Sequence, residues 1–227
     1  MLILVFIITM ALCAVLAVGQ NSRVYESEQL DRVGYGDVTS WIIEQPGVED
    51  LIDQIEELRG TEKTERQKIK QVSYKAGKKQ TQNNGMLAVY EPENYDYYIY
   101  KEDLTGIQKN PKEPKNGEMY VSPSFITMYG VDIGDSVEIQ IAGEEKQMRF
   151  TIRGFFEDPF AGSSMMGVKT MLINKASMEE LEQNALMAGD ASTVADAEML
   201  YIFQKKDSGQ KTKEFIKELN ENTDLKN

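Results

Sequence analysis

The chain has 227 residues, a net charge of −12 at neutral pH and no histidine. The missing histidines exclude histidine-based triads, general bases and metal ligands. The acidic balance disfavours binding to nucleic acid and leaves no polybasic patch for anionic lipids. The single cysteine is Cys13. It lies in an apolar run, so the remainder of the chain offers no thiol chemistry.

The run Met1–Val18 is uncharged and almost entirely aliphatic or aromatic. As an α-helix it would extend about 27 Å, close to the hydrocarbon thickness of a bilayer, so residues 1–20 are predicted to span a membrane. The side chains expected to face lipid are Leu2, Leu4, Phe6, Ile7, Leu12 and Leu16. A cleaved signal peptide is the alternative, although a basic start and a clear cleavage site are both missing. The missing basic flank suggests that a cytoplasmic segment precedes Met1 in the parent protein.

Two elements are expected directly after residues 21–36, which we interpret as a stalk. Asp37–Ile43 is β-branched and aromatic, which predicts a strand. After a turn at Pro46-Gly47, Val48–Leu58 places its apolar residues on one stripe, which predicts an amphipathic helix closed by Gly60. Together they form a β-α unit.

The next part of the chain is more polar. Thr61–Asn84 is rich in Lys, Gln and Thr, and its weak alternation over Ile69–Tyr74 predicts an edge strand. Met86–Tyr90 predicts another short strand. Lys109–Gly117 is rich in Pro, Gly and Lys and is the best candidate for an internal boundary.

The most strongly patterned stretch follows this boundary. Met119–Val121 predicts a strand, and Ser122-Pro123 predicts the N-cap and first turn of a short helix that ends at Gly130. Two alternating runs then predict a β-hairpin with one buried face. They are Val137, Ile139, Ile141 and Met148, Phe150, Ile152, with a tip at Ala142–Glu145.

The C-terminal part predicts a second β-α unit. Thr170–Ile173 is expected to be a strand, and Ser177-Met178-Glu179-Glu180 a capping box that opens a helix reaching about Met187. Glu198–Gln204 then predicts a strand and Lys211–Leu219 an amphipathic helix. The predicted fold class is α+β, with a mixed sheet, β-α units and a central hairpin region.

Few residues are arranged for catalysis. Ser208 and Lys211 match S-x-x-K, but the S-D-N and K-T-G elements of penicillin-recognising enzymes are missing, so Ser208 is expected to cap or precede the last helix. Asp132, Asp135, Asp190 and Asp196 are interpreted as turn residues, because no calcium-loop pattern surrounds them. No catalytic residue, metal or cofactor is predicted.

Two groups of side chains are candidates for contact with a partner or cargo. The first is Tyr95, Tyr97, Tyr98 and Tyr100, because tyrosine combines a large rigid ring with a polar tip. The favoured alternative is that these rings pack one face of a strand. The second group is Met165-Met166, inside the GSSMMG segment of Phe155–Gly167. The favoured alternative is that this segment is simply a flexible loop.

Three runs carry a family resemblance: EMYVSPSFITMYGVDIGDSVEIQI from Glu118, MRFTIRGFFEDP from Met148 and SSMMGVKTMLIN from Ser163. This segment resembles the extracytoplasmic domain of FtsX-like ABC-transporter permeases, the group with the MacB-like periplasmic core domain. The order of apolar helix, GDVTSWI strand, PGVEDLIDQIEEL helix, central β region and final LYIFQKK and KTKEFIKELN elements also agrees with that family.

The resemblance implies a division of the chain and a set of partners. Residues 37–227 would form the extracytoplasmic domain, with possible lobes at 37–108 with 190–227 and at 118–189. The bilayer would hold residues 1–18, and three further spanning helices would follow Asn227. An ABC ATPase subunit would act through those missing parts, and a peptide, a lipid or an extracytoplasmic protein would be cargo or partner. A membrane-anchored or secreted non-enzymatic binding protein is the alternative function.

Overall fold

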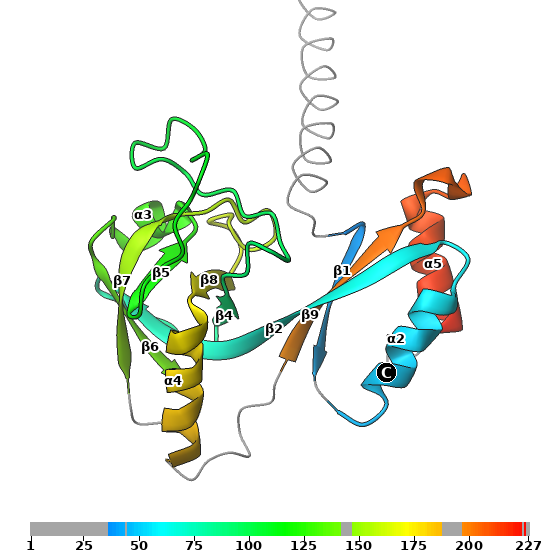
Figure 1. The fold of residues 1–227 in the computed structure, drawn as a ribbon, viewed down its shortest axis with the longest axis horizontal. Helices are drawn as coiled ribbons and strands as arrows, with labels where there is room; N and C mark the ends of the chain where they lie inside the picture. Colours follow the sequence, from blue (N-terminus) through cyan, green and yellow to red (C-terminus); the bar gives the residue numbers. More distant parts are fainter. Residues whose placement is uncertain (1–35, 44, 142–146, 188–196, 224, 226–227) are drawn as a thin grey trace, which may run out of the picture.

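The computed structural model describes residues 36–43, 45–141, 147–187, 197–223 and 225, and within them one mixed β-sheet runs the length of the domain (Figure 1). The strands are β1 (Val38–Ile43), β2 (Thr61–Ala76), β3 (Lys79–Gln80), β4 (Gly85–Val89), β5 (Glu118–Val121), β6 (Ser136–Ile141), β7 (Met148–Phe155), β8 (Lys169–Ile173) and β9 (Ala197–Gln204). The helices are α2 (Val48–Glu57), α3 (Ser124–Tyr129), α4 (Lys175–Met187) and α5 (Thr212–Asn222), with a 3-10 helix η1 (Lys206–Ser208). The predicted α+β class with a mixed sheet is confirmed.

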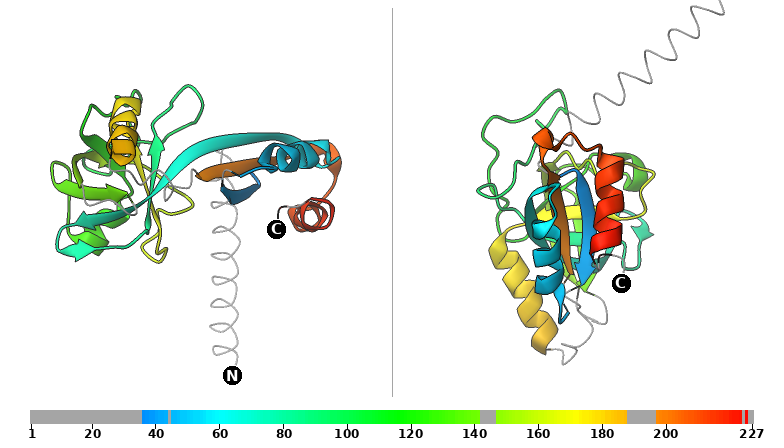
Figure 2. Two further views of the ribbon diagram at one scale, coloured as in Figure 1. Left: turned by 90° about the horizontal axis from the view of Figure 1, so that it is seen from below. Right: turned by 90° about the vertical axis from the view of Figure 1, so that its right-hand side faces the viewer.

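Two helices and three strands form what we call the helical lobe. β1 pairs antiparallel with β9, and β9 pairs with the first half of β2. α2 and α5 lie beside these strands (Figure 2), and their apolar stripes meet in one core. Ile55 of α2 and Phe215 of α5 are fully buried there against Leu200 and Ile202 of β9. The two predicted β-α units, β1-α2 and β9-α5, are therefore confirmed, and they pack together.

The other strands close into a ring, which with α3 and α4 we call the ring lobe. The second half of β2, then β4, β8, β5, β7 and β6, pair in that order, and β6 pairs back with β2. The predicted hairpin is confirmed by the antiparallel pairing of β6 with β7, in which Val137 faces Phe150. Both side chains are fully buried among the apolar residues of the ring interior. The predicted hairpin tip lies outside the described residues.

β2 is the strand that both lobes share, and it runs between them as one curved strand (Figures 1 and 2). The prediction of a short edge strand over Ile69–Tyr74 is wrong, because β2 spans Thr61–Ala76 and lies between β9 and β4. The alternation of polar and apolar residues in β2 is hard to recognise, because one face of the strand is buried in one part and exposed in another. Val72 and Tyr74 enter the ring interior, whereas Lys68 on the same face is exposed.

Helix α4 begins earlier than its sequence pattern predicts. The helix starts at Lys175, and the side chain of Asn174 accepts a hydrogen bond from the Ser177 backbone N–H at 2.9 Å. Asn174 is thus the capping residue, and the predicted capping box at Ser177 is wrong. Ser177 is buried instead, and its hydroxyl accepts a hydrogen bond from the Gly117 N–H at 3.2 Å.

The loop between β7 and β8 is held by two buried charged side chains. Oδ1 of Asp158 accepts hydrogen bonds from the backbone N–H groups of Phe160 and Ala161 at 2.9 and 2.8 Å. The Lys169 ammonium, which is fully buried, donates to the carbonyl oxygens of Ala161 at 2.9 Å and of Ser163. Desolvation raises the pKa of Asp158 and lowers the pKa of Lys169. The first half of the loop is therefore anchored by its own side chains, and the segment predicted to be flexible, GSSMMG, follows it.

Some predictions fall on parts that the structure leaves undescribed. Met1–Val18, with Leu2, Leu4, Phe6, Ile7, Leu12 and Leu16, lies outside the described residues. Among the helices that are described, none is long and apolar enough to cross a bilayer. The predicted lobe boundaries (37–108 with 190–227, and 118–189) stay a prediction, while the structure places β4 in the ring through its parallel pairing with β8.

Substituting Lys169→Met tests the anchoring of the loop. We expect a loss of about 3 kcal/mol in the free energy of unfolding, because two buried carbonyl groups lose their hydrogen-bond donor and the buried Asp158 carboxyl loses a nearby positive charge. The measurement is urea unfolding followed by circular dichroism. Lys175→Met, at an exposed position close in sequence, is the matched control and should change stability by less than about 0.5 kcal/mol. Equal losses in the two variants would contradict this account.

Candidate functional site

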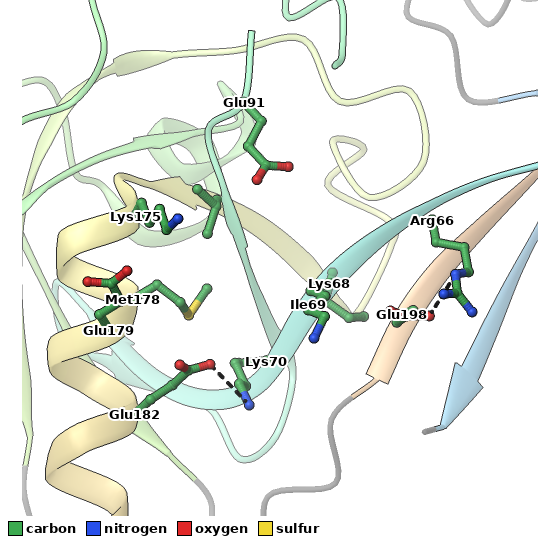
Figure 3. A pocket seen from close by; sticks show the side chains of 11 residues that line it. Arg66, Lys68, Ile69, Lys70, Glu91, Lys175, Met178, Glu179, Glu182 and Glu198 are labelled. Carbon is green, nitrogen blue, oxygen red and sulfur yellow. Dashed lines mark ion pairs between the residues drawn. The ribbon is translucent and has the colours of Figure 1, made fainter. Parts of the chain in front are cut away.

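Two adjoining hollows on one side of β2 form a concave surface. The first, with a volume of about 450 Å³, lies between β2 and α4 (Figure 3), and the second, of about 560 Å³, lies between β2 and the start of α2. Arg66, Lys68 and Glu198 line both hollows. We call the combined surface the β2 groove; it extends from α4 in the ring lobe to α2 in the helical lobe.

Ion pairs connect β2 to the elements on both sides of the groove. Arg66 reaches Glu49 of α2 at 2.7 Å and Glu198 of β9 at 3.4 Å. Lys70 reaches Glu182 of α4 at 3.3 Å. Figure 3 shows the Arg66–Glu198 and Lys70–Glu182 pairs at separate points along β2. Such pairs stabilise partly exposed surfaces only weakly, so their main effect is to fix side-chain positions.

Lys68 lies between these two ion-paired residues on the same face of β2. Glu198 is its cross-strand neighbour, yet the Glu198 carboxylate pairs with Arg66 instead. Among the described residues, the Lys68 ammonium has no hydrogen-bond or ion-pair partner. An exposed cation is thus available where the two hollows meet.

The far end of the first hollow carries further charges of both signs. Lys175 and Glu179 come from the first turns of α4, and Glu91 comes from the segment after β4. None of these three side chains has an ion-pair partner within the described parts of the chain. The groove therefore presents unpaired ammonium and carboxylate groups together.

The floor between these charges is narrow and apolar. Ile69, Val89 and Met178 line the first hollow, and Ile69 and Met178 are only 4% and 7% exposed. Little apolar area is open to a ligand, so the charged groups and the shape of the groove dominate what it can bind.

None of the four candidate tyrosines lines the groove, and Tyr95, Tyr97 and Tyr98 pack on the other side of β2. Their segment forms no strand over residues 91–98, so the expectation that they pack one strand face is wrong. All four rings are half-buried. Tyr97 accepts a hydrogen bond from the Gln67 amide at 2.8 Å, and the Tyr95 hydroxyl donates to the Arg66 carbonyl at 2.7 Å. These rings tie the segment to β2. Their predicted role in partner contact stays a prediction.

The two candidate methionines lie in the second half of the β7–β8 loop. Met165 is 93% exposed and Met166 is 38% exposed. The anchored first half of this loop places Phe160 against Trp41 of β1, with ring centroids 6.4 Å apart. Contact of Met165 and Met166 with a partner likewise stays a prediction.

The remaining polar candidates occupy turns. Ser208 ends η1 ahead of α5, which agrees with the expected entry loop. Asp135 accepts a hydrogen bond from the Asp132 backbone N–H at 2.8 Å, so both are turn residues as expected. Asp190 and Asp196 lie outside the described residues. Across the described ranges, no group of three or more His, Cys, Asp or Glu side chains could hold a metal ion.

The β2 groove was not predicted from sequence. Its residues come from five segments that are distant in the chain, and only the fold brings them together. The single local signal is the basic series Arg66, Lys68, Lys70 at every second position, which places three cations on one face of a strand.

Comparison with known proteins gives similar structures but no similar sequences. No protein-family model matches the chain, and no curated protein sequence matches it. The extracellular domain of the noncanonic ABC-type transporter YknZ from Gram-positive bacteria is 11% identical, with a TM-score of 0.33, and the match covers 77% of this chain and 78% of that one. A permease-protein domain from Porphyromonas gingivalis is 17% identical, with a TM-score of 0.33 and coverage of 86% and 79%.

The periplasmic region of MacB from Actinobacillus actinomycetemcomitans is 10% identical, with a TM-score of 0.34, and the match covers 86% of each chain. The similar structures are thus an extracellular domain of an ABC-type transporter, a domain of a permease protein and the periplasmic region of MacB. Identities and TM-scores as low as these support no conclusion about the activity of this chain.

The half-buried tyrosines predict a loss of stability in alkali. Burial first, and the carboxylates of Glu91, Glu65 and Glu198 next, raise the pKa of Tyr95 to about 12. In the unfolded chain tyrosine ionises near pH 10, so between about pH 10 and 12 only the unfolded state gains the charge, and folding weakens. Urea midpoints measured from pH 8 to 11 should fall above pH 10. The fall should be smaller in Tyr95→Phe, and an identical fall in both proteins would contradict this assignment.

Proposed function

We propose that the chain is the extracytoplasmic domain of an ABC-transporter permease, together with its first membrane-spanning helix. One observation in the structure supports this most directly. β1, at the start of the domain, pairs with β9 over Val38–Ile43, and α5, at its end, packs into the same lobe. A domain inserted between two membrane spans needs its entry and its exit in one region.

The central segment is organised in a way that fits the same proposal. The residues that carry the permease resemblance, Glu118–Ile173, supply β5, α3, β6, β7 and β8 of the ring lobe. They are inserted between the two β-α units of the helical lobe. The apolar run Met1–Val18 would then place this domain against the outer surface of a membrane.

In this proposal the domain itself performs no chemical step. An ATPase, on a separate subunit or on a fused domain, would drive motion that reaches the outer domain through the membrane spans of the permease. The domain would couple that motion to export of a lipid-like or peptide substrate, or to control of a partner outside the membrane. The β2 groove lies beside the strand that joins the two lobes, so it is the place where such a partner or substrate would bind.

The open reading frame around this chain gives the first test. We expect three further apolar stretches of about 20 residues each after Asn227. The encoded protein, purified in detergent with its co-expressed ATPase, should form a stable complex that hydrolyses ATP. A stop codon directly after Asn227 would contradict the proposal and favour a membrane-anchored or secreted binding protein.

A further inference from the structure

We propose that the β2 groove binds an extended segment of a protein partner outside the membrane, and that this segment presents both acidic and basic side chains. This names the chemistry of the partner; its place outside the membrane rests on the proposed function, whereas binding to the groove is tested separately. The inference follows from charge, shape and the composition of the groove floor.

Charge complementarity identifies the chemistry of the ligand. The cations Arg66 and Lys70 are already neutralised by Glu49, Glu198 and Glu182. The groups left for a ligand are the ammonium of Lys68 at the centre and, at the α4 end, the ammonium of Lys175 and the carboxylates of Glu91 and Glu179. A ligand of one charge sign would satisfy some of these groups and be repelled by the others. One that carries both signs can pair with all of them.

The form of the groove favours a polypeptide that continues beyond it. The two hollows lie on either side of the Arg66–Lys68–Glu198 row, are both open to solvent and together extend from α4 to α2. A small molecule would fill one hollow, whereas an extended chain, at about 3.3 Å per residue, can pass over Lys68 and occupy both. Because neither end is closed, an internal stretch of a protein fits better than a short peptide that must bury its ends.

Two other ligand classes fit less well. An acyl chain needs a large apolar surface, but the apolar floor is limited to Ile69, Val89 and Met178, two of which are almost fully buried. A nucleic acid would be repelled by the net charge of −12. A mixed-charge protein segment is the remaining class that uses all the unpaired groups.

The test selects ligands for the full 227-residue chain in a lipid nanodisc. A library of random octapeptides is displayed within a loop of a carrier protein, so that both ends of each peptide continue into protein. Enriched sequences are expected to contain at least one acidic and one basic residue. Their affinity for the chain, measured by fluorescence anisotropy, should fall about tenfold with Lys68→Glu and with Glu91→Lys.

Matched controls separate this site from the general charge of the protein. Lys63→Glu is the control for Lys68→Glu, because it makes the same charge reversal on β2 but outside both hollows. Glu93→Lys is the control for Glu91→Lys, because it makes the same charge reversal two residues away. Both control variants should bind the selected peptides with an affinity within about twofold of that of the unsubstituted chain. Exchanging the acidic residue of a selected peptide for lysine should restore its binding to the Lys68→Glu variant, which a merely misfolded variant would not do.

Several results would overturn the inference. These are no enrichment above the empty carrier, binding that is indifferent to Lys68→Glu and Glu91→Lys, and equal losses in the two controls. Enriched peptides that are purely aliphatic would also overturn it, because they would indicate an apolar ligand such as a lipid. None of these results bears on the permease proposal, which the reading frame and the ATPase complex test separately.

Discussion

The side chains on one face of β2 are apolar where the strand lines the ring and basic where it crosses between the lobes. Val72 and Tyr74 lie in the ring interior, and Arg66, Lys68 and Lys70 occupy the stretch before them. The backbone of this strand pairs with β9 at one end and with β4 and β6 at the other. Both lobes therefore depend on the same row of hydrogen bonds, and we infer that they fold as one cooperative unit.

This constraint also produces the β2 groove. A strand that leaves one core and enters another must cross a region where neither core covers it. The exposed stretch carries charged side chains, since apolar ones would be left in water. The ion pairs of Arg66 and Lys70 hold α2 and α4 on the two sides of this crossing. Because the strand is continuous, the walls of the groove keep their spacing, which reduces the entropy that a ligand must lose on binding.

A second cluster fills the opposite side of the crossing. Met86, Tyr90 and Tyr201 pack there with the half-buried tyrosines of residues 95–98. Gln67 links two of the hydroxyl groups: its amide donates to Tyr97, and its oxygen accepts from Tyr201 at 3.0 Å. Polar groups at this depth are stable only when they are paired. The tyrosines thus stabilise the junction between the lobes from the side away from the groove.

Elements with a local periodic signal could be predicted from the sequence, and those defined by distant contacts could not. The hairpin of β6 and β7 and the helices α2 and α5 each carry a complete amphipathic pattern within one segment. The sequence pattern predicts too short a β2 because the surroundings of this strand change along its length. As a result, neither face of the strand is apolar from end to end. The cap of α4 was misplaced because Asn174 competes with a good capping motif three residues later.

The groove escaped prediction for a further reason. Lys68 and Glu91 are separated by β3 and β4, and α4 follows only after the rest of the ring. Only the closure of the ring brings α4 back to β2. A sequence pattern predicts which residues share one face of a single helix or strand. It could therefore indicate three cations on β2 but not the carboxylates that other elements place beside them.

Native-state hydrogen exchange of the amides in β2 and its partner strands tests the central claim, that one strand makes both lobes a single cooperative unit. The account predicts that the most protected amides of β9, in the helical lobe, and of β4 and β6, in the ring lobe, exchange with the same opening free energy and respond equally to added denaturant. Protected amides in one lobe that open at a free energy lower by about 2 kcal/mol or more, while the other lobe stays closed, would contradict it.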